Sequence, residues 1–186
     1  MNIKSLVIKE GIERLGGVRK EEFITTAGQR ANRKVELDVL NEQKNLNRLL
    51  RQMVIGDLAT KLTNYEPDLI VPIPKGANHL GKGLAQRLYL PVGYLDWKDK
   101  TPGAKDIQPR TEHDRELIQA AGKIALIDDV LTSGSSLLAV CQMNEMVESD
   151  IVAAVVWDRS DGSYKDALPF PIESIIQEHI PLWIED

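Results

Sequence analysis

The stretch from Lys123 to Ser136, KIALIDDVLTSGSS, constrains the fold more than any other part of the chain. Apolar or small residues at 124–127 lead directly into Asp128 and Asp129, a loop of hydroxyl residues and one glycine follows, and a helical pattern begins at Leu137. This order predicts a buried strand, a tight loop and the start of a helix. Such a loop directs backbone N–H groups and the positive end of a helix dipole at one spot, so the stretch predicts an anion site.

The side chains of this loop suit a phosphate group, and the two acids suit a sugar. Asp128 and Asp129 are expected at the carboxyl end of the strand, where they accept hydrogen bonds from sugar hydroxyls or hold a divalent cation. A sugar that carries a 5′-phosphate fits both halves. The alternative is that these residues only cap the helix, since Ser, Thr and Asp are common N-caps. The hydroxyl donors are Thr132, Ser133, Ser135 and Ser136, and Gly134 lets the backbone approach closely.

Composition limits the remaining possibilities. A chain of 186 residues suits one domain with a real core, here residues 1–186. The net charge of −5 argues against broad nucleic-acid binding. The single cysteine, Cys141, excludes an internal disulfide and a cysteine metal site. There is no apolar run of ~20 residues and no signal-peptide core at the N-terminus, so we expect no membrane span and a cytoplasmic location.

The first third of the chain predicts helices and short extended pieces. A helix is expected within residues 1–20, ending at Gly16-Gly17, and two extended pieces lie within 23–38 around a turn at Gly28. The basic cluster of Arg30, Arg33 and Lys34 is interpreted as solvated surface, with an anion contact as the alternative. A longer helix is expected over 41–63 because apolar residues recur every three or four positions: Leu46, Leu49, Leu50, Met53, Val54, Leu58 and Leu62.

Three short apolar runs, at 69–73, 124–127 and 151–157, predict buried strands. Because helical segments separate them, they form a parallel sheet with crossover helices, which makes the fold class α/β. Ligands of such sheets bind at the carboxyl edge. Lys75, the loop from Asp128 to Ser136, and Arg159 all follow these strands, so we expect them to converge on one site.

The segment from Gly76 to Lys82 fits G-x-x-x-x-G-K, the start of a nucleoside-triphosphate P-loop. Position 83 is glycine, however, where that motif requires Ser or Thr to reach Mg²⁺. The segment is therefore a near miss, and a nucleotide hydrolase ranks last among the hypotheses. His79 and Lys82 are expected to be ordinary surface residues.

Residues 97–115 are polar, contain two prolines and show little apolar periodicity. A loop of about 20 residues is long for an idle connection in a compact domain. We interpret it as a flexible loop whose lysines, Lys98, Lys100 and Lys105, close over phosphates and exclude water. The alternative is a merely disordered insertion.

These motifs together resemble the type I phosphoribosyltransferase family, and within it the orotate phosphoribosyltransferases. The stretch DDVLTSGS from Asp128 resembles the signature for phosphoribosyl pyrophosphate (PRPP), and Pro72-Ile-Pro-Lys-Gly-Ala is similar to the lysine-bearing pyrophosphate loop. Two further matches are FITTAG from Phe23, which resembles F-x-L-K-S-G, and WDRSDG from Trp157, which resembles D-R-x-E-G. Tyr94 leads into the lysine-bearing loop, as in the family.

The resemblance implies a parallel-sheet fold with a small hood from about 1–40 and 170–186, and a homodimer in which the flexible loop reaches the partner subunit's site. It implies that a ring nitrogen of orotate displaces pyrophosphate from C1 of PRPP, with Mg²⁺ as cofactor and no metal ligand from the protein except Asp128 and Asp129 through water. The catalytic residues would be Asp128, Asp129, Lys98 and Lys100. The PRPP and pyrophosphate contacts would come from Thr132, Ser133, Gly134, Ser135, Ser136, Lys75 and Gly76. The base would contact Arg159, Thr26 and Thr132.

The sequence departs from the family at two places that face the base and the pyrophosphate. Thr26 stands where the family has lysine, and the loop from Trp97 lacks the family's histidine. Two alternatives to orotate transfer therefore stay open: a phosphoribosyltransferase for another base, and a non-catalytic protein that senses PRPP or a nucleotide.

Overall fold

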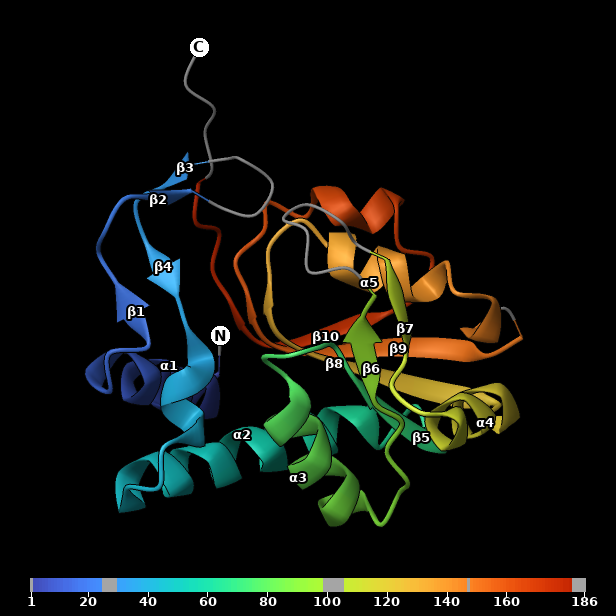
Figure 1. Cartoon of the computed structure of the whole chain (residues 1–186). Coiled ribbons are helices and arrows are strands. Elements are labelled where there is room, and N and C mark those ends of the chain that lie inside the picture. Colours follow the sequence, from blue (N-terminus) through green and yellow to red (C-terminus); the bar gives the residue numbers. More distant parts are fainter. Residues whose placement is uncertain (1, 25–29, 99–105, 147, 182–186) are drawn as a thin grey trace.

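A parallel sheet of four strands carries the predicted strand ends (Figure 1). The structure is a computed structural model that describes residues 2–24, 30–98, 106–146 and 148–181. The strand order is β10-β9-β8-β5, and every neighbouring pair is parallel. The predicted parallel α/β sheet is thus confirmed. The strands are β5 (Leu69–Pro72), β8 (Lys123–Leu131), β9 (Asp150–Asp158) and β10 (Ile172–Gln177).

Alternate residues of β5 and β8 enter two separate hydrophobic clusters, one on each face of the sheet. In β5, Ile70 belongs to one cluster, whereas Leu69 and Val71 belong to the other. In β8, Ile127 and Leu126 divide in the same way. Successive side chains of a strand point to opposite faces. Both faces are covered, which explains why these strands are continuous apolar runs in the sequence.

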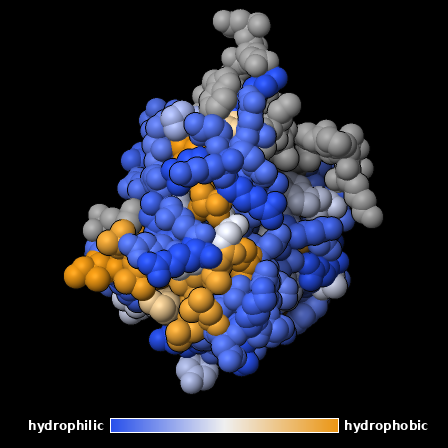
Figure 2. Space-filling model, turned by 90° about the vertical axis from the view of Figure 1, so that its left-hand side faces the viewer, coloured by the Kyte–Doolittle hydropathy of each residue, from blue (hydrophilic) through white to orange (hydrophobic). Residues whose placement is uncertain are grey.

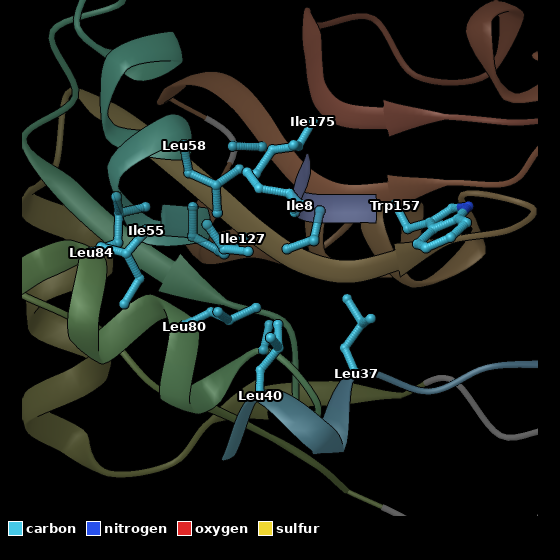
Figure 3. Packing of buried hydrophobic residues seen from close by; sticks show 14 of the residues in the cluster. Ile8, Leu37, Leu40, Ile55, Leu58, Leu80, Leu84, Ile127, Trp157 and Ile175 are labelled. Atoms are coloured by element: carbon cyan, nitrogen blue, oxygen red, sulfur yellow. The ribbon is translucent and has the colours of Figure 1, made fainter. Parts of the chain in front are cut away.

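Helices cover both faces. On one face lie α1 (Ile3–Arg14), α2 (Asn45–Leu62) and α3 (Asn78–Leu88), whose apolar side chains pack against the sheet as Figure 3 shows. On the other face lie α4 (Glu112–Ala120) and α5 (Ser135–Cys141).

Short strand pairs and single-turn helices complete the fold. The extended pieces expected within 23–38 are confirmed, because β2 (Phe23–Ile24) pairs with β3 (Arg30–Ala31). The other elements are β1 (Val18–Arg19) paired with β4 (Lys34–Val35), the hairpin of β6 (Leu95–Trp97) and β7 (Ile107–Pro109), and the 3₁₀ helices η1 (Leu37–Asn41), η2 (Asn144–Met146) and η3 (Ser163–Asp166).

Three boundaries differ from the sequence-based expectation. The loop expected over 97–115 is shorter than predicted. Ile107 is buried within β7, and a capping box of Thr111 and Asp114 starts α4. Strand β8 runs through both acids to Leu131, and α5 begins at Ser135. The segment 172–177, expected in the hood, is instead the edge strand β10 of the main sheet.

The helix expected over 41–63 forms, but two of its leucines face outward. The buried stripe of α2 includes Leu50, Val54 and Leu58, whereas Leu46 and Leu49 are 58% and 60% exposed. Leu46 and Leu49 each come one position before a buried residue of α2, and at 3.6 residues per turn one position turns a side chain by about 100° around the helix axis. Figure 2, which views the left-hand side of Figure 1, shows apolar side chains gathered on one part of that face. In α1, Ile3, Leu6 and Val7 are also exposed.

Within the described parts of the chain, no helix is long and apolar enough to span a membrane.

Candidate functional site

The carboxyl edge of the sheet brings together three of the segments that the sequence singles out. The N–H of Ile73 donates to the carbonyl oxygen of Ile127 over 2.8 Å, which holds the segment after β5 beside β8. The N–H of Arg159 donates to the carbonyl oxygen of Leu131 over 3.0 Å, which holds the segment after β9 at the same edge. Lys75, the hydroxyl loop and Arg159 therefore follow neighbouring strand ends.

Asp129 lies against the backbone of Gly76. A Cβ atom built on Gly76 would come within 2.7 Å of Cγ of Asp129 and still closer to Oδ2. A Cβ atom at this position would have to displace the Asp129 carboxylate. The peptide bond between Pro74 and Lys75 is cis. Lys75 is exposed at this loop, next to the acid pair.

The two neighbouring acids differ in environment. Asp128 is buried and its Oδ1 accepts a hydrogen bond from the N–H of Asp129 over 2.9 Å, while Oδ1 of Asp129 accepts one from the N–H of Val130 over 2.9 Å. Burial, followed by the negative charge of Asp129, raises the pKa of Asp128 well above its usual value. An acid pair of this kind is relieved by hydroxyl donors or by a cation.

No cluster of three or more His, Cys, Asp or Glu side chains able to hold a metal occurs among the described residues. The carboxylates of Asp128 and Asp129 are the candidate metal ligands at this edge. Mg²⁺ prefers oxygen ligands and keeps several waters, so two carboxylates fit it when substrate oxygens supply most of the remaining contacts.

The hydroxyl loop lines a small polar cavity. Residues Asp128 and Val130 to Ser136 enclose about 160 Å³. The Oγ atoms of Ser133 and Ser135 lie 2.9 Å apart. Gly134 has φ of 73°, a left-handed conformation that glycine adopts without steric cost. Since α5 is only seven residues long, backbone N–H groups and hydroxyls would contribute more to anion binding than its dipole.

A buried acid and a tyrosine support this loop from behind, and the sequence alone assigns neither of them a role. A Cβ atom built on Gly134 would lie 2.9 Å from Cβ of Tyr164. The hydroxyl of Tyr164 donates to Oδ2 of Asp158 over 2.9 Å, and Ser160 donates to Oδ1 through its N–H and its Oγ. Burial and the bond to Asp158 raise the pKa of Tyr164 to about 12. The sequence signal that could have indicated this support is Asp158 at the end of a buried strand, followed five residues later by Ser163-Tyr164.

Arg159 is 3% exposed, and its carbonyl oxygen accepts from the N–H of Ile180 over 3.0 Å. Its pKa is lowered, first by burial and then by the positive charge of Arg33. Arg33 thus lies near Arg159, although 126 positions separate the two residues in the sequence. The guanidinium of Arg33 forms ion pairs with Glu178 at 2.9 Å and with Glu13 at 3.6 Å.

Arg33 was placed only in a surface cluster by the sequence, and its proximity to Arg159 was missed. Lys9 reaches Glu178 at 3.4 Å, and its ammonium lies 5.9 Å from the ring centroid of Trp157. The segment after β10 thereby connects α1 and the N-terminal strands to the sheet edge. No pattern in the sequence indicates which basic residue does this.

Lys98 is not among the residues that line the cavity of the hydroxyl loop. Lys98 pairs with Asp106 at 3.1 Å and lines a separate cavity of about 320 Å³, together with Arg115 and Glu145. The predictions for Lys100, Lys105 and Thr26 fall outside the described residues. His79 and Lys82 are exposed, as expected.

The near-miss P-loop is part of a helix. Gly81 and Gly83 lie within α3, where added Cβ atoms would meet Pro72 at 2.7 Å and Ile55 at 2.5 Å. These glycines allow α3 to pack closely on β5 and α2. They do not form a phosphate-binding loop, which removes the nucleotide hydrolase from consideration.

Comparisons with known proteins agree on one family. The model of the phosphoribosyl transferase domain matches residues 39–183. Orotate phosphoribosyltransferase of Thermotoga maritima is 24% identical over 178 residues, covering 95% of this chain and 88% of that protein. Adenine phosphoribosyltransferase of Acidiphilium cryptum is 25% identical over 134 residues, which cover 67% of this chain and 78% of that protein. The crystal structure of orotate phosphoribosyltransferase from Aeropyrum pernix shares the fold, with a TM-score of 0.70, 18% identity, and coverage of 92% and 93%.

Proposed function

Because the chain belongs to the phosphoribosyl transferase domain family, we propose that it transfers the phosphoribosyl group of PRPP to orotate and releases pyrophosphate. The observation that carries the PRPP half is the contact between Asp129 and Gly76 beside the hydroxyl loop. It joins a pyrophosphate-type loop, an acid pair and a phosphate-sized cavity at one sheet edge.

Each part of PRPP has a matching group at this edge. The 5′-phosphate lies in the cavity of the hydroxyl loop, where it accepts hydrogen bonds from side chains and backbone N–H groups. Asp128 and Asp129 accept hydrogen bonds from the two ribose hydroxyls. Lys75 and the backbone at Gly76 contact the pyrophosphate. The groups around the 5′-phosphate are Thr132, Ser133, Gly134, Ser135 and Ser136.

Arg159 binds the acidic substituent of the base. A buried guanidinium forms a bidentate pair with a carboxylate, and this pair is stronger in a low-dielectric site. Arg33 adds positive charge nearby, since it lowers the pKa of Arg159. A base that carries a carboxylate offsets this repulsion, whereas a neutral base does not. Thr132 and Thr26 are proposed as further contacts to the base.

In the reaction, the ring nitrogen of the base forms a bond to C1 of the ribose while the bond from C1 to the pyrophosphate oxygen breaks. The electron pair of that bond leaves with pyrophosphate, and the nitrogen loses its proton to solvent. The protein positions the two reactants and stabilises the charges that develop. When bound, Mg²⁺ would neutralise pyrophosphate charge, and Asp128 and Asp129 would hold it through water.

The flexible-loop lysines, Lys98 and Lys100, are proposed to act in the site of a partner subunit. In support, Lys98 pairs with Asp106 and lines a cavity whose lining does not include Asp128. A homodimer supplies the missing cations to each site. Sedimentation equilibrium should then give a dimer mass.

A second candidate is transfer to another base, since an adenine phosphoribosyltransferase is among the relatives and Thr26 replaces the lysine of the orotate family. Pyrophosphate release should be measured with PRPP and Mg²⁺ against orotate, uracil, adenine and hypoxanthine. Turnover with orotate and not with uracil supports the proposal, because only orotate carries the carboxylate.

Two other outcomes reject it. Turnover with adenine or hypoxanthine alone assigns the chain to another base. PRPP binding without pyrophosphate release from any base indicates a sensor. The variant Glu116→Gln, at an exposed position of α4, serves as a control in this assay and should release pyrophosphate with the same base preference as the wild type.

A further inference from the structure

We infer that Trp97 is a positioning residue for the pyrophosphate loop: its indole N–H holds the peptide group that precedes Lys75. Nε1 of Trp97 donates to the carbonyl oxygen of Pro74 over 3.1 Å. Trp97 and Pro74 lie 23 positions apart in the sequence, so this bond joins the β6–β7 hairpin to the segment after β5. The inference rests on the proposed function, in which this loop contacts pyrophosphate.

The bond acts on Lys75 through the planarity of the peptide group. The carbonyl oxygen of Pro74 and the N–H of Lys75 belong to one rigid plane. Fixing the oxygen therefore fixes the direction of the N–H. On the other side of Lys75, its carbonyl oxygen accepts from the N–H of Asn78 over 3.3 Å. Lys75 is thus held by the hairpin before it and by the start of α3 after it.

Trp97 can serve this role because the root of the hairpin is itself held in place. Oδ1 of Asp114 accepts from the N–H of Tyr94 over 2.8 Å, and the same carboxylate closes the capping box of α4. The N–H of Arg110 donates to the carbonyl oxygen of Tyr94 over 2.9 Å. Arg110 also pairs with Asp96 at 3.2 Å. These bonds fix the start of β6 relative to the N-terminus of α4.

Packing completes the support. Leu95 and Ile107 are buried in the cluster on the α4 and α5 face, and the half-buried Trp97 ring packs against that cluster. A ring held in this way loses little further side-chain freedom when it forms the bond to Pro74. The hydrogen bond and the packing can be separated by substitution.

Trp97→Phe keeps an aromatic ring and removes the N–H donor. Binding of pyrophosphate with Mg²⁺ and of ribose 5-phosphate should be measured by calorimetry for the full-length protein. We expect pyrophosphate affinity to fall by about two- to tenfold, the effect of one neutral hydrogen bond. Affinity for ribose 5-phosphate should stay at the wild-type value, because the lost donor bonds to Pro74 and not to the hydroxyl loop.

Ile107→Val is the matched control. It removes one methylene from the same cluster and leaves the indole donor in place. Both variants should lower the melting temperature, but only Trp97→Phe should weaken pyrophosphate binding. A purely structural role of Trp97 would weaken both ligands equally, or neither, and either result overturns the inference.

Failure of the proposed function is distinguishable from failure of this inference. A wild-type protein that binds neither pyrophosphate nor ribose 5-phosphate overturns both. A wild-type protein that binds both ligands, with unchanged pyrophosphate affinity in Trp97→Phe, overturns the inference alone.

Discussion

The carboxylate of Asp129 occupies the space that a side chain at Gly76 would fill, with Cγ only 2.7 Å from the position of a Cβ atom there. Asp129 lies near the carboxyl end of β8, and Gly76 lies in the loop after the neighbouring parallel strand β5. The close approach places a carboxylate, which faces the ribose in the proposed function, directly beside the backbone of the pyrophosphate loop. In the proposed function, this one contact would position both ends of the pyrophosphate-ribose linkage.

Gly76→Ala should therefore impair turnover. The methyl group must displace either Asp129 or the loop, so we expect kcat/KM for PRPP to fall at least tenfold, since a small misplacement at a reacting centre is costly. Gly56→Ala is the control. Gly56 lies within α2, and the nearest atoms to a Cβ atom built there belong to the Arg87 side chain of α3, at 3.7 Å, an ordinary contact distance. That variant should keep wild-type kinetics and gain up to about 1 kcal/mol of stability. Equal kinetics for the two variants would contradict the role of the contact.

The acid pair should be essential to PRPP use. The double variant Asp128→Asn, Asp129→Asn keeps the volume and removes both charges. We expect PRPP affinity or turnover to fall tenfold or more, since hydrogen bonds to charged groups contribute about 1.5–3 kcal/mol. Steady-state kinetics at varied PRPP measure this. Unchanged kinetics would refute the ribose-binding role of the pair.

Asp128 should also make stability depend on pH. Burial and Asp129 raise its pKa in the folded state above 3.8, the value expected for the unfolded chain. The folded state then binds the extra proton, so the contribution of Asp128 to stability is favourable below pH 3.8 and is lost as pH rises through the higher folded pKa.

Asp128→Asn cannot ionise and should melt above wild type at neutral pH, by about 2–4 °C for each kcal/mol released. The difference should vanish as pH falls to 3.8. Thermal melts of both proteins across this range measure it. A variant that is less stable than wild type at neutral pH would show that Asp128 is not destabilised by its surroundings.

Tyr164→Phe should weaken the support of the hydroxyl loop. The change leaves Oδ2 of Asp158 without its 2.9 Å donor in a buried position, which costs about 1–3 kcal/mol. We expect a lower melting temperature and weaker binding of ribose 5-phosphate. Tyr65→Phe removes a hydroxyl bonded to the more exposed Glu173, far from the loop, and should leave that binding unchanged. Equal ribose 5-phosphate affinity in both variants would show that Tyr164 does not support the loop.

Arg159→Gln tests the base half of the site. Loss of the guanidinium should raise KM for orotate at least tenfold, as expected for a charged hydrogen bond worth about 1.5–3 kcal/mol. KM for PRPP should change less than twofold. Initial rates at varied orotate and varied PRPP separate the two, and a rise confined to PRPP would place Arg159 elsewhere in the site.

The strands and the order of site segments were predictable because they depend on local composition. The runs that became β5, β8 and β9 are apolar throughout, as both faces of a parallel sheet require. The outer position of Leu46 and Leu49 was not predictable, because apolar spacing alone does not say which stripe of a helix faces the sheet. Strand β7 within 97–115 was missed because a three-residue strand leaves almost no periodic signal.

The sequence by itself determined the parallel sheet, the family, and the hydroxyl loop with its two acids, because these follow from the order of residues along one short segment. Only the tertiary structure decided which distant residues meet that segment. Gly76 against Asp129, Tyr164 behind Gly134, Arg33 near Arg159 and Trp97 on Pro74 are contacts between different elements. Their formation depends on strand order, helix placement and packing, and none of these is encoded in the spacing of residues within a motif.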